Sequence, residues 1–150
     1  MQLSSKGRYA VMAMADLANR SVSGPLPIAS VAEHQNISQA YLEQIFMQLR
    51  RGGLVNSSRG PGGGYVLARD PQDISIFEIM QAVDEPVQMT RCSIKDPGGC
   101  VLGSRCLTHG LWQDLGAHIA KFLEDTSLED VIGNSEQTDF LTADENGVLL

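Results

Sequence analysis

The sequence ISQAYLEQIFMQLRRGGLVNSSRGPGGGYVLA covers residues 37–68 and contains one helical pattern followed by two short strand patterns. Apolar residues recur in its first half at spacings of three and four, as on the buried face of a helix: Leu42, Ile45, Phe46 and Leu49. Ser38 is a favourable cap for the start of this helix, and Gly52 can end it. The pattern therefore predicts a helix over residues 39–52 with a glutamine-rich outer face.

A shorter helical pattern, IASVAEHQ at residues 28–35, comes directly before this helix. Pro27 suits the first position of a helix, and Asn36 with Ile37 predicts a tight turn between the two helices. This arrangement is a helix-turn-helix, which can place its second helix in the major groove of DNA. Glutamines on the outer face can bind adenine there, and Ala40 can contact a thymine methyl group. An ordinary helical hairpin is the alternative that these residues alone leave open.

Two strand-like segments follow at residues 54–58 and 65–68, separated by RGPGGG at residues 59–64. A hairpin with a tip of glycine and proline directly after a helix-turn-helix is typical of a wing. Arg59 at the root of the hairpin can enter a minor groove or bind phosphate. A phosphate-binding P-loop is excluded, because it needs Lys and Ser or Thr after the last glycine, whereas Tyr65 begins a strand.

A helical pattern at residues 4–20 precedes the helix-turn-helix, with Ser4 or Ser5 as its cap. Lys6 and Arg8 lie in the first turn of this helix, where positive charge opposes the helix dipole. This arrangement costs a little stability unless an anionic group, such as a phosphate, lies nearby.

Two further helices are predicted after the wing. The first begins at residue 76, with Ser75 and Glu78 as a capping box, and ends at Pro86. The second covers residues 107–126 and carries an apolar stripe: Leu107, Leu111, Leu115, Ile119, Phe122 and Leu123. The stripe is too long for a small domain to cover, so we expect a homodimer interface, with packing inside the chain as the alternative. Two recognition helices in a dimer could bind two DNA half-sites.

These patterns divide the chain into three regions. We expect residues 1–70 to form a winged helix-turn-helix that binds DNA. We expect residues 71–133 to hold the dimerisation helix and a loop that contains all three cysteines. A last short helix, LEDVIG, is capped by Thr126 and Glu129. Residues 134–150 are acidic and lack periodicity, so we expect a mobile tail. The predicted fold is mainly α with a small β-hairpin wing.

Charge is distributed unevenly along the 150 residues, whose formal net charge is −7. Residues 1–69 hold seven Lys or Arg and three acidic residues, a net charge of +4, which leaves −11 for residues 70–150. A basic half beside an acidic half indicates a nucleic-acid-binding face on a protein that otherwise repels nucleic acid. An uneven spread of solvated charge is the alternative.

The sequence predicts a cytoplasmic protein that does not enter a membrane. We find no secretory signal and no apolar run as long as a membrane span. An odd number of cysteines without such a signal argues against a disulfide framework and for a reducing compartment.

All three cysteines lie in the glycine-rich segment RCSIKDPGGCVLGSRCLTH, residues 91–109. With one histidine they form the pattern C-x7-C-x5-C-x2-H: Cys92, Cys100, Cys106 and His109. Three thiolates and one imidazole in a flexible loop can bind a tetrahedral zinc ion or an iron–sulfur cluster. The spacing alone leaves both possibilities open.

Several of these segments resemble the iron–sulfur-cluster-sensing winged-helix regulators of the IscR, NsrR and RirA type. The resemblance covers about residues 1–133 and rests on these segments: SSKGRYAV, ISQAYLEQIFMQLRRGGLV, RGPGGGY, AVDEPV and CLTHGLW. Members of this family are dimeric transcription regulators with an N-terminal winged helix and a long dimerisation helix. The resemblance implies a homodimeric DNA-binding regulator, mainly a repressor, of iron–sulfur cluster assembly genes.

The resemblance also implies site residues. Members of the IscR type bind a 2Fe–2S cluster through ligands that correspond here to Cys92, Cys100, Cys106 and His109, with the cluster assembly machinery as donor. The implied DNA contacts are Ser38, Glu43, Gln44, Arg59 and Pro61. The full set of DNA-binding residues that we predict also includes their neighbours Gln39, Ala40 and Gly60. Glu43 corresponds to the acid that lets cluster-bound and cluster-free forms choose different DNA sites.

The chain departs from the IscR pattern at two points. The gap between Cys92 and Cys100 is longer than in IscR itself and matches RirA-like members. A nitric-oxide- or iron-responsive relative with a 4Fe–4S cluster is therefore an alternative, although His109 favours the IscR type. The second departure is Ala40, where IscR has serine.

Three other functions fit the sequence less well. The cysteine pattern is close to CCCH zinc fingers, which stack RNA bases on aromatic side chains, but no aromatic residue lies between Cys92 and His109. A regulator with a structural zinc ion is a second alternative. An enzyme is disfavoured, because Cys106 and His109 could form a thiol–imidazole pair but no third group orients them. His34 and His118 are interpreted as surface or helix-packing residues.

Overall fold

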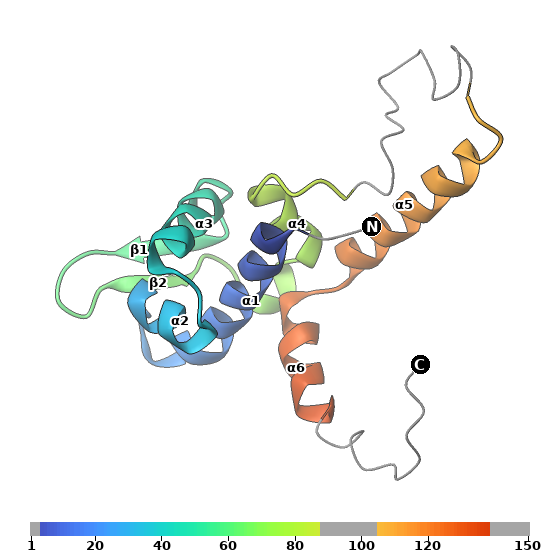
Figure 1. Ribbon diagram of the computed structural model, residues 1–150. Helices are drawn as coiled ribbons and strands as arrows, with labels where there is room; N and C mark the ends of the chain where they lie inside the picture. Colours follow the sequence, from blue (N-terminus) through green and yellow to red (C-terminus); the bar gives the residue numbers. More distant parts are fainter. Residues whose placement is uncertain (1–3, 88–104, 139–150) are drawn as a thin grey trace, which may run out of the picture.

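The computed structural model describes residues 4–87 and 105–138, with side chains as far as residue 133. The described residues form helices and one two-stranded sheet (Figure 1), as the sequence predicts. The elements are α1 (Ser5–Arg20), α2 (Ile28–Gln35), α3 (Gln39–Arg51), β1 (Val55–Ser58), β2 (Gly64–Leu67), α4 (Ile76–Ala82), α5 (His109–Asp125) and α6 (Leu128–Thr138), with short 3-10 turns η1 (Ser21–Ser23) and η2 (Pro71–Asp73).

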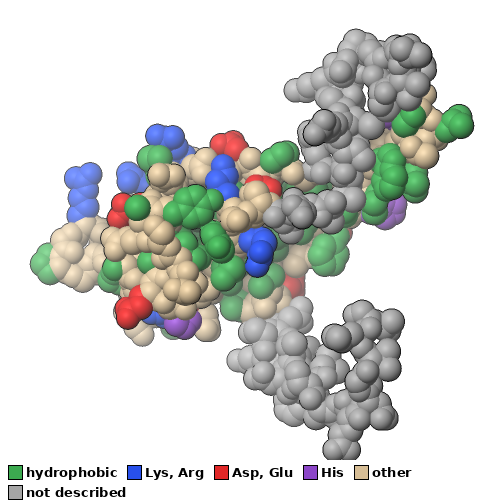
Figure 2. All heavy atoms as spheres, viewed as in Figure 1, with side chains coloured by type: hydrophobic (Ala, Val, Ile, Leu, Met, Phe, Trp, Pro, Cys, Tyr) green, Lys and Arg blue, Asp and Glu red, His purple; other side chains and the backbone are tan. Residues whose placement is uncertain are grey.

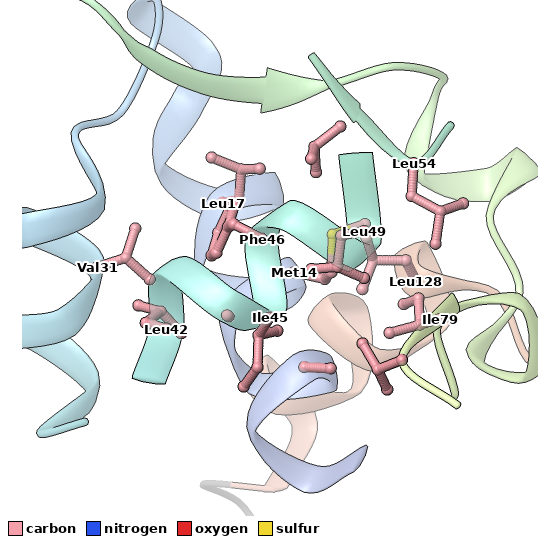
Figure 3. Close-up of a cluster of buried hydrophobic side chains, with 14 of the residues drawn as sticks. Met14, Leu17, Val31, Leu42, Ile45, Phe46, Leu49, Leu54, Ile79 and Leu128 are labelled. Carbon is pink, nitrogen blue, oxygen red and sulfur yellow. The ribbon is translucent and has the colours of Figure 1, made fainter. Parts of the chain in front are cut away.

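The core forms around the apolar face of α3 (Figure 3). The residues that the periodicity assigns to this face are fully buried: Leu42, Ile45, Phe46 and Leu49. Side chains from other elements join them in one cluster: Met14, Leu17, Val31, Leu54, Ile79 and Leu128. Full burial of one such side chain stabilises the fold by roughly 1.5–3 kcal/mol. The buried face therefore fixes the direction in which the polar face of α3 points.

The turn between α2 and α3 closes as predicted. Asn36 has a left-handed conformation, with φ of 53°, and its N–H donates to Glu33 O at 3.2 Å. The N–H of Ile37 donates to Ala32 O at 2.9 Å. These two bonds form the Schellman motif, which satisfies carbonyls at the end of α2 and turns the chain into α3.

The wing is the antiparallel pair β1 and β2, in which Val55 pairs with Leu67. Leu26, in the segment before α2, adds an isolated bridge to Tyr65 through two hydrogen bonds of 2.9 Å. At Gly64 an added Cβ would lie 2.3 Å from Leu26 O, so only glycine fits this contact. The glycine-rich sequence thus lets the wing approach the start of the helix-turn-helix.

Two of the predicted caps are present. Ser4 Oγ accepts a hydrogen bond from the N–H of Gly7 at 3.4 Å, at the start of α1. Ser75 and Glu78 form the predicted capping box on α4, with distances of 3.0 and 3.1 Å. Pro27 occupies the cap of α2 rather than its first helical position.

The predicted cap of the last helix is wrong by one residue. Ser127 and Asp130 form a capping box, in place of Thr126 and Glu129. Thr126 Oγ1 instead donates to Phe122 O at 2.6 Å and closes the end of α5. Backbone hydrogen bonds between residues 126–128 and 74–76 set this register, which local sequence does not reveal. The helix also continues to Thr138, beyond the predicted end at residue 133.

Helix α5 extends away from the body of the molecule (Figure 1). It begins at His109 rather than at residue 107, and none of its residues, all of which are described, is buried. Figure 2 shows hydrophobic side chains on its surface; Leu111 is 60% exposed and Phe122 is 67% exposed. No helix in the described part of the chain is both long enough and apolar enough to span a bilayer.

Candidate DNA interface and cysteine segment

The exposed face of α3 carries the predicted base-contacting residues. They are all solvent-exposed: Ser38, Gln39, Ala40, Glu43 and Gln44. Gln39 Nε2 donates a hydrogen bond of 3.0 Å to Glu43 Oε1. Ser38 stands at the N-cap position, but its side chain makes no capping hydrogen bond in the described part of the chain. The hydroxyl of Ser38 is therefore not held by the helix start.

Gln48 differs from the other glutamines of α3. The sequence places it on the outer face, whereas the structure shows it half-buried. Its Nε2 donates to Asp84 Oδ2 at 3.1 Å, at the end of α4. The polar face available to a ligand is therefore shorter than the glutamine pattern predicts.

The tip of the wing holds Arg59, Gly60 and Pro61, all of them exposed. Gly60 has φ of 94° and Gly62 has φ of 74°, conformations that residues with a side chain rarely adopt. The tip turns tightly because of these two glycines. Several Lys and Arg side chains project from the end of the molecule that contains α3 and the wing (Figure 2).

An open hollow of about 400 Å³ lies where the last turns of α3 meet the wing. It is lined by Met47, Arg50, Arg51 and Tyr65. Both arginines are exposed, and Met47 is 48% exposed. The sequence analysis did not assign Arg50 or Tyr65 to the DNA interface. Their positions in the sequence were a usable signal, because Arg50 lies in the last turn of the predicted recognition helix and Tyr65 lies in the predicted wing. The hollow adds two cations to the face defined by α3 and the wing.

A buried acidic residue connects α1 with α2. Asp16 is 5% exposed, and its carboxylate lies 2.8 Å from the Arg20 guanidinium and 2.7 Å from His34 Nδ1. Arg20 also donates to Ser30 Oγ at 2.6 Å. These bonds hold α2 against α1 and thereby support the helix-turn-helix. The His34 side chain makes this contact while it is 58% exposed, which agrees with the interpretation of His34 as a surface or helix-packing residue.

Of the four predicted metal ligands, Cys106 and His109 are described, whereas Cys92 and Cys100 lie outside the described residues. Cys106 is half-buried, and its Sγ lies 3.4 Å from Thr108 Oγ1. The N–H of His109 donates to Cys106 O at 3.1 Å, so one turn joins the two residues at the start of α5. Within residues 4–87 and 105–138, no three potential ligands of a metal ion gather.

The donor set still fits a soft metal ion or cluster. A thiol and an imidazole with two residues between them are ligands that zinc and iron–sulfur clusters accept. The start of a helix favours anionic groups, such as a thiolate, through the helix dipole. Trp112 Nε1 donates to Thr108 Oγ1 at 3.2 Å, which holds the turn between the two ligands against α5.

A helix-turn-helix whose second helix buries an apolar face and exposes a polar one, with a two-stranded wing beside it, defines a winged-helix DNA-binding protein. The chain belongs to the Rrf2 family, described as iron-dependent transcriptional regulators, and the match covers residues 3–134.

Named relatives support this class. The HTH-type transcriptional regulator IscR of Photorhabdus laumondii is 51% identical over 146 residues, which cover 97% of this chain and 88% of the relative. The IscR regulator of Xenorhabdus nematophila is 54% identical over 139 residues, which cover 93% of this chain and 84% of the relative. These names confirm the resemblance to the IscR type and the prediction of a regulator rather than an enzyme.

Solved structures share the fold. CymR of B. subtilis, described as a global cysteine regulator, matches with a TM-score of 0.74 and 32% identity over 89% of this chain and 97% of that chain. T. potens IscR matches with a TM-score of 0.73 and 33% identity over 98% of this chain and 94% of that chain.

Proposed function

We propose that this chain is a homodimeric repressor of iron–sulfur cluster assembly genes that senses the occupancy of a 2Fe–2S cluster. The observation that carries the proposal is the turn joining Cys106 to His109 at the start of α5, in a chain about half identical to regulators named IscR. The cysteine segment thus leads directly into the exposed apolar helix, so a change at the ligands can alter that helix.

The DNA-binding part of the proposal assigns α3 to the major groove. Gln39, Ala40 and Gln44 are exposed and of types that contact base edges, with Ser38 beside them at the helix start. Glu43 can accept a hydrogen bond from cytosine and repels phosphate, so its carboxylate can restrict the choice of DNA site. Its bond from Gln39 holds it on this face.

The wing and the neighbouring arginines would bind the sugar–phosphate backbone and the minor groove of the DNA. Arg59, Gly60 and Pro61 form an exposed, narrow tip suited to a minor groove. Arg50 and Arg51 border the hollow between α3 and the wing and can neutralise phosphate charge. Substitution of Arg50 should therefore weaken binding to every duplex and reduce its salt dependence, whereas substitution of Gln44 should weaken binding to selected duplexes.

The dimer would form through α5. Leu111, Leu115 and Phe122 are exposed along this helix, with Trp112 beside them. An exposed apolar stripe of this kind is typical of an interface with a second chain. Dimerisation would bring two copies of α3 to two half-sites of one operator.

The cluster ligands in the proposal are Cys92, Cys100, Cys106 and His109, with the cluster assembly machinery of the cytoplasm as donor. When bound, a 2Fe–2S cluster supplies a redox-sensitive and iron-dependent crosslink between its ligands. His109 can ligate only when its imidazole is neutral, so it makes the site sensitive to acid. Replacing it with a thiolate, as in His109→Cys, should slow the loss of the cluster; equally fast loss would contradict this role of His109.

The decisive experiment is anaerobic purification followed by a visible spectrum and analysis of iron, sulfide and zinc in one sample. Iron and sulfide near two of each per chain would support the 2Fe–2S site. Four of each would favour a nitric-oxide- or iron-responsive relative. A colourless protein with one zinc ion per chain would contradict cluster sensing and leave a regulator with a structural zinc.

A further inference from the structure

The end of α4 contains a turn that contacts both α1 and α3. Asp84 has φ of 54°, and its N–H donates to Gln81 O at 3.0 Å. The N–H of Glu85 donates to Met80 O at 2.9 Å. This is a second Schellman motif, like the one at Asn36, but with aspartate at the left-handed position.

Glycine is the residue that adopts this backbone conformation at least cost, and asparagine is the usual substitute. Asp84 is therefore strained, and its side chain has a contact that glycine could not make. Its Oδ2 accepts the 3.1 Å hydrogen bond from Gln48 in α3. The strained turn and the polar face of α3 are thus joined by one side-chain bond.

The same turn contacts the start of α1 through Glu85. Its carboxylate accepts hydrogen bonds from the N–H of Ser4, at 3.0 Å, and from the Ser4 hydroxyl. An added Cβ at Gly7 would lie 2.8 Å from Glu85 Cγ, so the glycine provides the space for this side chain. Hydrogen bonds from Ser4, with the positive charge of Lys6 nearby, lower the pKa of Glu85. This carboxylate places a negative charge near Lys6 in the basic first turn of α1.

The last turns of α3 and α4 are also in close contact. An added Cβ at Gly52 would lie 2.9 Å from the Cβ of Ala82. Asp84 follows Ala82 by two residues. The close approach of Gly52 to Ala82 and the hydrogen bond from Gln48 to Asp84 therefore lie next to each other, where the end of α3 meets the end of α4. The position of α3 therefore depends on the conformation at the end of α4.

We propose that Asp84 and Glu85 are positioning residues that fix the orientation of α3 and link it to the segment leading to Cys92. This inference rests on the proposed function, in which α3 contacts DNA and the cysteine segment binds a cluster. Glu85 precedes Cys92 by seven residues. In the chain, the turn at Asp84 and Glu85 lies between α4 and that segment, and it contacts α3 through Gln48 and α1 through Ser4.

The first test is a double-mutant cycle on the full-length, cluster-free protein. The probe is a duplex that the wild-type protein selects from a random-sequence pool. Asp84→Gly and Gln48→Ala should each weaken binding about threefold to tenfold, and the double variant should lose no more than either alone. Additive losses would show that Gln48 contacts DNA directly and would overturn the proposal. Gln81→Ala, at an exposed position on α4, is the matched control and should bind like the wild type.

Thermal unfolding separates positioning from simple destabilisation. Glycine relieves the left-handed strain at residue 84, so Asp84→Gly should unfold at the same or a higher temperature than the wild type while binding DNA more weakly. Asp84→Asn keeps an acceptor for Gln48 and should restore affinity. A lower melting temperature in Asp84→Gly, or wild-type affinity in that variant, would overturn the proposal.

The link to the cysteine segment is tested by comparing affinities with and without a reconstituted cluster. Asp84→Gly and Glu85→Gln should bind the cluster with wild-type visible absorbance, while the ratio of the two affinities moves toward one. A wild-type ratio retained by both variants overturns the link alone. If the wild-type protein has equal affinity with and without the cluster, both the proposed cluster sensing and the link to the cysteine segment are overturned. The double-mutant cycle then still decides whether Asp84 positions α3.

Discussion

The winged helix and α5 use apolar residues in opposite ways. In the winged helix the periodic apolar face of α3 is fully buried, with Phe46 at its centre. In α5 most of an equally regular stripe is exposed, with Phe122 67% exposed, while Ile119 and Leu123 are half-buried. One region buries its apolar face in a core, whereas the other keeps apolar side chains exposed that nothing in residues 4–87 and 105–133 covers. Periodicity alone therefore shows that a face is apolar, and only the structure shows whether the chain itself covers it.

The largest expected effect is on the buried side of this comparison. Phe46→Ala should lower the free energy of unfolding by about 3–5 kcal/mol, because it leaves a cavity in a closely packed core. Phe122→Ala is the matched variant on α5. It should change the free energy of unfolding by less than about 0.5 kcal/mol in dilute, monomeric protein. Urea unfolding measures both. A loss at Phe122 similar to that at Phe46 would show that the Phe122 side chain is part of the same folded core.

The next largest effect is expected on the association of two chains into the proposed dimer. Leu111→Asp combined with Phe122→Asp should weaken the dimer at least about a hundredfold, because both charges would enter an apolar interface. Sedimentation velocity over a range of concentrations gives the dissociation constant. Val22→Asp is the control, since Val22 is 86% exposed but lies in the winged helix. If Val22→Asp dissociates the dimer and the α5 variant does not, the interface lies on the winged helix.

A smaller effect is expected where the wing meets the helix-turn-helix. Gly64→Ala should cost about 1–3 kcal/mol, because the new Cβ would collide with Leu26 O. Gly53→Ala is the control: Gly53 has φ of 73° but nothing within 4 Å of its Cβ position, so it should cost only about 1 kcal/mol. Thermal unfolding ranks the two. Equal losses would mean that backbone conformation, and not the contact with Leu26, requires glycine in the wing.

The sequence predicts those features that repeat along one helix or strand. The burial of Leu42 and Leu49, the wing and the capping box at Ser75 follow from local patterns, and the structure contains all of them. The apolar stripe of α5 is equally visible in the sequence. Its role in a dimer remains a prediction, because a single chain contains no partner.

Features that join distant segments were not predictable in this way. The bond from Gln48 to Asp84 spans 36 residues, and the register of the cap at Ser127 depends on backbone pairing with residues 74–76. No local pattern distinguishes Gln48 from Gln44, although one is half-buried and the other exposed. The DNA contacts remain predictions for a different reason, since their exposure permits binding without specifying a base.

The smallest expected effect concerns two carboxylates, Glu78 at the start of α4 and Asp125 on α5. Burial raises the pKa of Glu78, but the hydrogen bond from the Ser75 N–H and the neighbouring Arg69 outweigh it, so its pKa lies below the usual value. Because the folded pKa is lowered, this carboxylate stabilises the fold above the usual range for glutamate, and the contribution is lost as the pH falls through that range. Glu78→Gln should therefore shift the urea midpoint at pH 7 but hardly at pH 3.

The expected size of this shift is below about 1 kcal/mol, because the pair of Arg69 and Glu78 is 41% and 40% exposed. Asp125→Asn, which breaks the more exposed pair with Lys121 on α5, should shift the midpoint less at either pH. The distinction follows from what each carboxylate holds. Glu78 closes the start of a helix that packs into the core, whereas Asp125 lies on a helix that has no buried residue. An equal response at both sites would mean that the cap adds nothing to the exposed ion pair.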